Sequence, residues 1–362
     1  MIGFDKFTKM FSVICITILL FIAGFNYYMD PAGIFNNKKV DIAVRYLING
    51  YTFTGPTNFD ERIFKKELIL QTKIKPETIV LGSSRAMGIR AEFDKDFNSF
   101  GNYGVSGANF NDDIALFSVY FEKYKDVPEK LILAVEPWDL NENRKDTRWT
   151  SLEKEYYRGL KLLNFQGEKI KETNRISYIF EKVKTLLSIS YLKNSVKELK
   201  NDTKISGVLI KDNCDIDINI VLPDGSVRYG SIDENLTEKE IAKKALSYIN
   251  NGRIYQLDSF NELNQNDINK FLSFIKFLKA NNVEIVLWFP PYHPLVYDYI
   301  AKSDKYKNVL MAEKFFMNMA EKYSLKIYGS YNPQVCGVDE NDFSDGMHLR
   351  TSGYGKVFKE KF

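Results

Sequence analysis

The sequence of 362 residues contains only two histidines and three cysteines, and its charges nearly cancel. Two histidines without a cluster of carboxylates fall short of a metal site, so the sequence predicts neither a metal nor a cofactor. The cysteines form no metal-ligand spacing. Fifty basic and 47 acidic side chains leave a net charge of +3. Such a balance gives no basis for a nucleic-acid-binding protein.

Long apolar runs are also missing, apart from one at the N-terminus. MFSVICITILLFIAGF, residues 10–25, carries no charge, and NYYM extends it. About 20 residues are needed to cross the hydrocarbon of a bilayer, and Lys6 and Lys9 before the run favour a cytoplasmic N-terminus. No convincing cleavage pattern follows. The run therefore predicts an uncleaved single-pass anchor that contacts the bilayer through residues 10–29; a cleaved signal peptide and a buried core helix are the alternatives.

The predicted anchor would place the rest of the chain outside the cytoplasm, where cysteines can form disulfides. Cys15 lies within the apolar run. Cys214 and Cys336 can either pair in an oxidising compartment or remain buried thiols. The sequence leaves both alternatives open.

Short apolar runs alternate with amphipathic helical patterns along the remaining chain. They lie at residues 77–81, 99–107, 130–138, 283–291 and 325–331. Short apolar runs that stop at glycine or proline are typical of buried parallel strands. Strands that alternate with helices indicate a parallel sheet covered on both faces. The expected fold class is therefore α/β.

Residues 140–250 interrupt this alternation. They are rich in lysine and glutamate, and they contain helical patterns in SLEKEYYRGLKLL and ISYIFEKVKTLLSI together with a hairpin signal in NIVLPDGSVRYG. Their lysine-rich part, residues 150–200, suits either anionic lipid or polymer, or a solvated helix face. The pattern predicts an anchor at 1–29 and one α/β domain at 30–362, with a mostly helical insertion or lid at about 140–260.

Residues capable of acyl chemistry follow the predicted strands. In open α/β sheets, sites gather at the carboxyl ends of the strands. GSSR (82–85) follows the first run, VSGAN (105–109) the second, and SDGMHL (344–349) the fifth. Taken singly, each motif also suits an ordinary turn, a helix cap or a surface ion pair.

Together the three motifs predict a serine nucleophile with its base. A serine hydroxyl is a poor nucleophile until a base removes its proton, and a carboxylate fixes the tautomer of that base. We expect His348 to act on Ser84, or on the adjacent Ser83, with Asp345 orienting the imidazole ring. The backbone N–H groups of Ser84 and Gly107 are the expected oxyanion donors.

Other side chains near the strand ends are candidates for substrate binding. They are Arg85, Asn109, Trp138 and His293. Arg85 suits a carboxylate or phosphate, but it can equally pair with Glu136 or Asp139. Trp138 can stack on a sugar ring. His293 either lines the pocket or is exposed on its loop, and Asn109 is also a possible helix cap.

The motifs LGSSR, NYGVSGAN and SDGMHL resemble the first, second and fifth sequence blocks of the SGNH (GDSL-type) hydrolase superfamily. The resemblance covers roughly residues 77–139 and 265–362. It implies a three-layer, flavodoxin-like parallel sheet. It also implies that Ser84 is the nucleophile, that Gly107 donates to the oxyanion, and that Asp345 and His348 complete the triad.

One sequence block departs from this family pattern. The third block normally supplies Gly-x-Asn-Asp, whose asparagine is another oxyanion donor, whereas the third run here ends in AVEPWDLN. No asparagine stands at the expected place. Asn102, Asn109, Asn141 or a partner protein are the remaining candidates for this donor.

The anchor, the Gly-Ser-Ser variant and the missing third block narrow the resemblance. They are similar to the membrane-anchored branch that modifies cell-envelope polymers, which includes the D-alanine transfer protein of teichoic acid synthesis and the alginate O-acetyltransferases. The resemblance implies an extracytoplasmic serine O-acyltransferase that acts on an envelope glycan or teichoic-type polymer beside a membrane-bound O-acyltransferase. A serine esterase or deacetylase and a non-catalytic scaffold subunit of an acylation complex are the alternatives.

Overall fold

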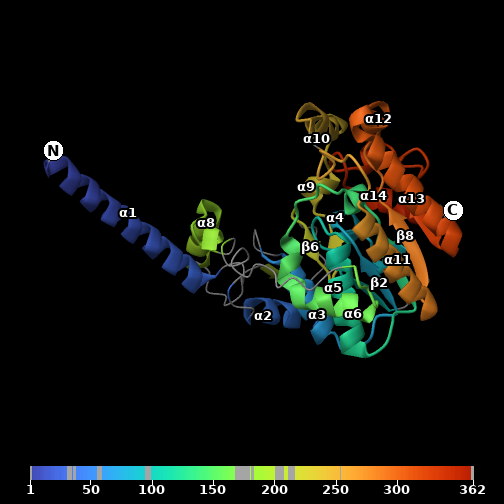
Figure 1. Cartoon of the computed structure of the whole chain (residues 1–362), viewed down its shortest axis with the longest axis horizontal. Coiled ribbons are helices and arrows are strands. Elements are labelled where there is room, and N and C mark those ends of the chain that lie inside the picture. The colour runs from blue at the N-terminus through green and yellow to red at the C-terminus, as the bar shows by residue number, and fades with distance from the viewer. Residues whose placement is uncertain are drawn as a thin grey trace.

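Five parallel strands form the central sheet of the computed structural model (Figure 1). In sheet order they are β3 (Phe100–Asn102), β2 (Thr78–Leu81), β4 (Lys130–Ala134), β8 (Glu284–Phe289) and β9 (Lys326–Gly329). Each apolar run of the sequence supplies one of these strands. The predicted α/β class with a parallel sheet is therefore confirmed.

The structure describes most of the chain. The described residues are 2–30, 35, 38–54, 59–93, 99–167, 180, 183–199, 208–210, 217–252 and 254–359. Cys214 lies outside them, so both alternatives for Cys214 and Cys336, a disulfide or two thiols, stay open.

Alternate side chains of the strands pack into two separate cores. Ile79, Leu131 and Leu287 belong to the larger core, whereas their neighbours Val80 and Ile132 belong to the smaller one. This separation follows from the two-residue period of a strand, which sends successive side chains to opposite faces. Both faces of the sheet are therefore covered.

Different helices contribute to each core. The larger core takes residues from α2 (Lys38–Leu47), α3 (Glu61–Gln71), α5 (Phe110–Tyr124), α6 (Glu153–Leu162), α11 (Gln265–Ala280), α12 (Pro294–Lys302) and α13 (Lys307–Tyr323). The smaller core is closed mainly by α14 (Thr351–Lys359), whose Tyr354 and Phe358 stack on Trp288 of β8.

A second, antiparallel sheet forms outside the parallel one. Its order is β5 (Val208–Ile210), β1 (Thr52–Thr54), β6 (Ile220–Val221) and β7 (Val227–Arg228). The predicted hairpin is confirmed, because β6 pairs with β7. The described part of the insertion has more residues in helices than in strands. Its described α-helices include α6, α8 (Ile189–Leu199), α9 (Ser231–Glu234) and α10 (Glu238–Asn250). In addition, β1, which precedes the parallel sheet in the chain, pairs with β5 and β6 of the insertion.

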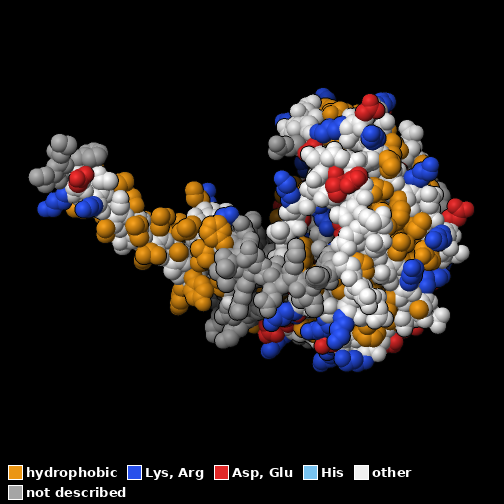
Figure 2. All heavy atoms as spheres, in the orientation of Figure 1, with side chains coloured by type: hydrophobic (Ala, Val, Ile, Leu, Met, Phe, Trp, Pro, Cys, Tyr) orange, Lys and Arg blue, Asp and Glu red, His pale blue; other side chains and the backbone are white. Residues whose placement is uncertain are grey.

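The N-terminal helix α1 (Ile2–Met29) projects from the α/β domain, with apolar side chains along its length (Figures 1 and 2). It is long and apolar enough to cross a membrane, and none of its apolar window is buried in the protein. A signal sequence has the same length and composition. The apolar run that predicts a membrane span thus forms a helix of sufficient length.

The last turns of α1 contact α8 and the residues just before it. The Asn26 side-chain N–H donates to the Leu186 carbonyl at 2.6 Å, and the Tyr191 hydroxyl donates to the Asp30 carboxylate at 2.6 Å. Leu186 and Tyr191 are buried, and Ala23 packs against them. We refer to this set of interactions as the α1–α8 contact.

Candidate active site

The turn after β2 positions two serines at the carboxyl end of the sheet. Gly82 has a φ of +135°, and a Cβ there would lie 2.3 Å from the Cβ of Ala134 on β4. Only glycine therefore allows the chain to turn this close to the neighbouring strand. Ser83 then caps α4 (Ser84–Met87) by accepting the Arg85 N–H at 3.1 Å.

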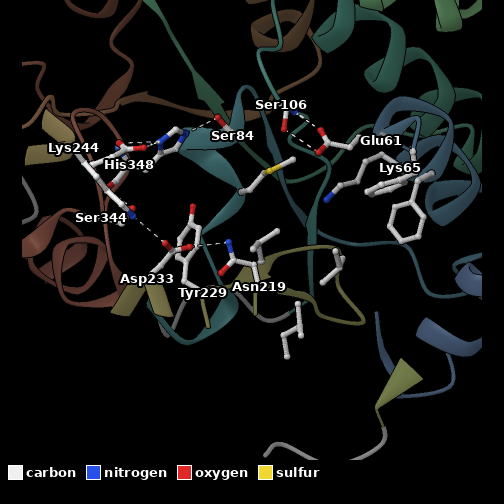
Figure 3. A pocket seen from close by; sticks show the side chains of 17 residues that line it. Glu61, Lys65, Ser84, Ser106, Asn219, Tyr229, Asp233, Lys244, Ser344 and His348 are labelled. Atoms are coloured by element: carbon white, nitrogen blue, oxygen red, sulfur yellow. Dashed lines mark hydrogen bonds and ion pairs between the residues drawn. The ribbon is translucent and has the colours of Figure 1, made fainter. Parts of the chain in front are cut away.

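Ser84, His348 and Asp345 form one hydrogen-bonded relay (Figure 3). Ser84 Oγ lies 2.9 Å from His348 Nε2, and His348 Nδ1 lies 2.9 Å from an Asp345 carboxylate oxygen. These distances fall in the range that proton transfer from serine to histidine requires. Both contacts that the sequence predicted are present. Ser84 and His348 remain partly accessible from a cavity beside them.

The loop that carries Asp345 holds its carboxylate in place. One oxygen accepts the backbone N–H groups of Met347 at 2.8 Å and His348 at 2.9 Å. Burial alone would raise the pKa of Asp345, but the adjacent His348 and these N–H donors outweigh it and lower the pKa below its usual value. The carboxylate is therefore ionised at neutral pH and fixes the proton on His348 Nδ1.

Tyr248 of α10 is a further member of the site that the sequence did not reveal. Its hydroxyl donates to the second Asp345 oxygen at 3.3 Å, and burial raises the pKa of Tyr248 so that it stays protonated. A Cβ at Gly346 would lie 2.7 Å from the Tyr248 ring, so the ring packs on the loop between Asp345 and His348. Nothing in the local sequence of α10 signals this contact.

Ser83, the alternative nucleophile, is hydrogen-bonded to Glu136 and not to His348. It is fully buried, and its hydroxyl donates to Glu136 at 2.5 Å. Of the two adjacent serines, Ser84 is the one that meets His348.

Arg85 is an interior cation, and the prediction that it binds substrate is wrong. Its guanidinium is 1% exposed and pairs with Glu136 at 2.8 Å. It also donates to the carbonyls of Met347, Pro290 and Pro291 at 2.9, 2.5 and 2.7 Å. The alternative, a structural pair with Glu136, is confirmed. Arg85 thereby ties the loops after β2, β4 and β8 to the loop of His348.

Trp138, His293 and Asn109 are also buried, and none of them lines the cavity beside Ser84, so their contact with substrate stays a prediction. The Trp138 indole N–H donates to the Ala108 carbonyl at 3.1 Å. His293 accepts the Leu295 N–H through Nδ1, and burial lowers the pKa of His293 to about 4. It is not the exposed loop residue that was the other expectation. Asn109 caps α5.

The candidate oxyanion donors differ in how the structure places them. Ser84 is the first residue of α4, so its N–H is one of those that a helix leaves without an intrahelical partner. Gly107 has a φ of +57°, and a Cβ there would collide with Arg148 and Tyr255. Its neighbour Ser106 lines the cavity, whereas Gly107 itself does not. The donor role of Gly107 stays a prediction.

Asn102 and Asn141 do not supply the third oxyanion donor. The Asn102 amide donates to the carbonyls of Ala86, Met87 and Ile89 at 2.9, 3.2 and 2.9 Å. The Asn141 amide donates to the Gln256 carbonyl at 2.7 Å. Both side chains therefore serve the scaffold.

A cavity of about 350 Å³ opens from Ser84 and His348 (Figure 3). Its walls come from α3, from the β6–β7 hairpin with α9 and α10, and from the loop of His348. The 217–250 part of the insertion thus lies beside the strand ends. Among the described residues, no group of histidines, cysteines and carboxylates is placed to hold a metal ion.

The chain matches no protein-family model, and no curated protein matches it significantly. The geometry of this site and the residues that form it are therefore the basis on which a function can be inferred.

Proposed function

We propose that this protein is a membrane-tethered, extracytoplasmic serine O-acyltransferase of the SGNH type that modifies a cell-envelope polysaccharide or a teichoic-type polymer. The observation that carries the proposal is the relay of Ser84, His348 and Asp345, with both contacts at 2.9 Å at the carboxyl edge of a parallel sheet. The strand order, 2-1-3-4-5 in chain order, is that of flavodoxin-like sheets, which the resemblance to SGNH hydrolases also implies.

The relay supports acyl transfer through an acyl-serine. His348 Nε2 takes the Ser84 proton while Ser84 Oγ attacks the acyl carbonyl, and the Ser84 N–H is placed to bind the oxyanion. His348 then gives its proton to the departing group, which leaves an ester on Ser84. An acceptor hydroxyl reverses these steps: His348 removes its proton, the oxygen attacks the ester, and Ser84 regains the proton. Asp345 and Tyr248 keep the imidazole in one orientation throughout.

Water and a sugar hydroxyl attack the same acyl-serine, so hydrolysis is the alternative outcome at this site. The proposal favours transfer because of the resemblance to envelope acyltransferases and because α1 suits a membrane anchor. A membrane-bound O-acyltransferase is the proposed source of the acyl group.

The test is to measure acyl release and acyl transfer with the full chain in detergent. Ser84→Ala and His348→Ala should each lower kcat by at least about 10⁴-fold, since the relay acts as a unit. Ser83→Ala should lose far less activity. The matched control Ser330→Ala, whose hydroxyl donates to Glu313, should leave activity unchanged.

A fluorophosphonate and mass spectrometry complete the test. The reagent should label Ser84 in the wild type but not in His348→Ala, because the labelled oxygen needs its base. Esterification of an added polyol indicates transfer, whereas release of free acid alone indicates an esterase. An unlabelled wild type with no Ser84-dependent activity would contradict both and support a scaffold role.

A further inference from the structure

The cavity beside Ser84 is much larger than an acetyl or similarly small acyl group needs. Its volume is about 350 Å³, roughly ten times the ~30 Å³ that one water occupies in the liquid. It falls within the size range of ligand pockets, about 300–1,000 Å³. The chemistry of its walls therefore indicates which part of a substrate it receives.

One set of wall residues is apolar and comes from elements outside the parallel sheet. These residues are Phe59 just before α3, Phe64 of α3, Met87 of α4, and Ile220, Val221 and Val227 of the β6–β7 hairpin. Phe59 and Phe64 meet edge to face, with ring centroids 5.6 Å apart. Such a wall is suited to hydrocarbon, because each buried methylene gains free energy by leaving water.

The polar groups on the same side of the cavity are already bonded to protein atoms. The Glu61 carboxylate accepts the backbone N–H and the hydroxyl of Ser106 at 2.5 and 2.9 Å. Lys65 is buried and donates to the carbonyls of Asn102 and Gly225. Burial lowers the pKa of Lys65 to about 8. These two side chains hold α3 against the cavity and leave no charged group there that needs a ligand.

The groups nearer to solvent lie on another side of Ser84. Lys244 is 43% exposed and lies 3.6 Å from Asp233, which also accepts the Asn219 amide at 3.1 Å. Figure 3 shows Lys244 on one side of Ser84, and Glu61 with Lys65 on the other. A substrate whose carbonyl lies at Ser84 can thus place its polar part near Lys244 and its hydrocarbon part near α3.

The apolar side of the cavity continues to the base of α1. Phe59 lines the cavity and also packs against the cluster of Leu186 and Tyr191, on which Ala23 of α1 rests. Apolar side chains thus connect the cavity wall to the helix that suits a membrane span.

We infer that this cavity binds the acyl chain of the donor, and that the chain is a hydrocarbon longer than acetyl. The inference rests on the proposed function, because it takes Ser84 as the nucleophile that receives the acyl group. The chain extends from Ser84 between the β6–β7 hairpin and α3, and the polar residues near Lys244 face the departing or accepting group.

The test compares alkyl phosphonates and p-nitrophenyl esters whose chains contain two, four, six and eight carbons. With the full wild-type chain in one detergent, kcat/KM and the rate of Ser84 labelling should rise about fourfold per added methylene until the cavity is full. Val221→Phe narrows the cavity from β6, so the ratio of the six-carbon to the two-carbon rate should fall at least about tenfold. The matched control Val335→Phe, which is outside the cavity, should keep the wild-type ratio.

The outcomes separate the inference from the proposed function. If Ser84 reacts with two-carbon and eight-carbon reagents at equal rates, the acyl-chain inference is overturned and the proposed function stands. If no reagent of any length labels Ser84, the proposed function fails and the inference falls with it. The wild-type series decides this even if Val221→Phe does not fold.

Discussion

The carboxylate of Asp345 accepts four hydrogen bonds, from two backbone N–H groups, the His348 ring and the Tyr248 hydroxyl. Each donor favours the ionised form, which explains why the pKa of Asp345 is lowered despite burial. Because Tyr248 belongs to the insertion, the orientation of His348 depends on a segment outside the parallel sheet. The pH dependence of stability should reveal this arrangement.

Asp345→Asn should remove a stabilising charge that is present only above acidic pH. An aspartate whose folded pKa lies below its unfolded value of about 3.9 stabilises the folded state above that pH, and this stability is lost as the pH falls through the folded pKa. The difference in unfolding free energy between wild type and Asp345→Asn should therefore shrink as the pH falls from about 5 to about 2. In addition, kcat should fall by roughly 10⁴-fold.

Urea unfolding at a series of pH values measures this difference. The control is Asp298→Asn on α12, whose carboxylate is 58% exposed and pairs with Lys302. Its effect should stay within about 0.5 kcal/mol. An Asp345→Asn difference that does not change with pH would contradict the assigned role.

Arg85→Met tests whether this residue is structural. The substitution leaves Glu136 buried without its cation, so the free energy of unfolding should fall by about 3–5 kcal/mol. The control Arg45→Met removes an ion pair whose arginine is 66% exposed, and should cost less than about 1 kcal/mol. Weaker substrate binding with unchanged stability would return Arg85 to the role of a substrate ligand.

At the level of elements, the insertion contacts both the candidate active site and helix α1. Its α10 supplies Tyr248 to the site, its β6–β7 hairpin walls the cavity, and its α8 contacts the end of α1. The α1–α8 contact buries Asn26 and Tyr191 completely. Helix α1 thus packs at its last turns on α8 and the residues just before it.

Tyr191→Phe should loosen α8 without affecting the parallel sheet. It removes a buried hydrogen bond to the Asp30 carboxylate, and bonds to charged groups contribute about 1.5–3 kcal/mol. Amide hydrogen exchange in α8 should speed up at least about tenfold, while exchange in β4 stays unchanged. The control Tyr124→Phe, which removes a bond to the Thr72 carbonyl, should not alter α8. Equal exchange in α8 of all three proteins would show that the contact contributes little.

At the level of the whole molecule, the residues before the apolar run predict on which side of a membrane the α/β domain would lie. Lys6 and Lys9 precede the apolar run, which favours a cytoplasmic N-terminus. A reporter fused after Phe362 should be active outside the cytoplasm, and the fusion should remain in the membrane fraction with an N-terminal tag attached. A soluble product without the tag would indicate a cleaved signal sequence, and activity only inside would reverse the topology.

The parallel sheet and the Ser84–His348–Asp345 contacts could be predicted because each depends on local patterns and one general rule. Short apolar runs between amphipathic helices mark the strands, and the carboxyl ends of parallel strands lie at one edge of the sheet. Ser84 and His348 each follow such a run, so their proximity could be predicted without detailed geometry. Asp345, three residues from His348, needed only one turn of chain.

The other features depend on distant partners that local patterns do not specify. Arg85 and Trp138 have side chains that suit a substrate, and only the tertiary structure shows that neighbouring loops bury them. The pairing of β1 with β5 and β6 joins segments more than 150 residues apart. Tyr248 reaches Asp345 across a separation of 97 residues. Such contacts depend on how the insertion packs against the rest of the chain, and no short sequence pattern specifies that packing.

The α1–α8 contact also limits how far the candidate active site can move relative to α1. A domain on a long flexible linker samples a large volume, and its effective concentration near a target at the same surface falls steeply as the linker lengthens. Here Asn26 and Asp30 at the end of α1 are bonded to Leu186 and Tyr191, and Phe59 of the α/β domain packs on the same two residues. For a protein held in a bilayer by α1, Ser84 would then be kept at a nearly constant height and would search for its partners in two dimensions. Polymer acceptors would have to come within that height, so their reach would decide which hydroxyls are modified.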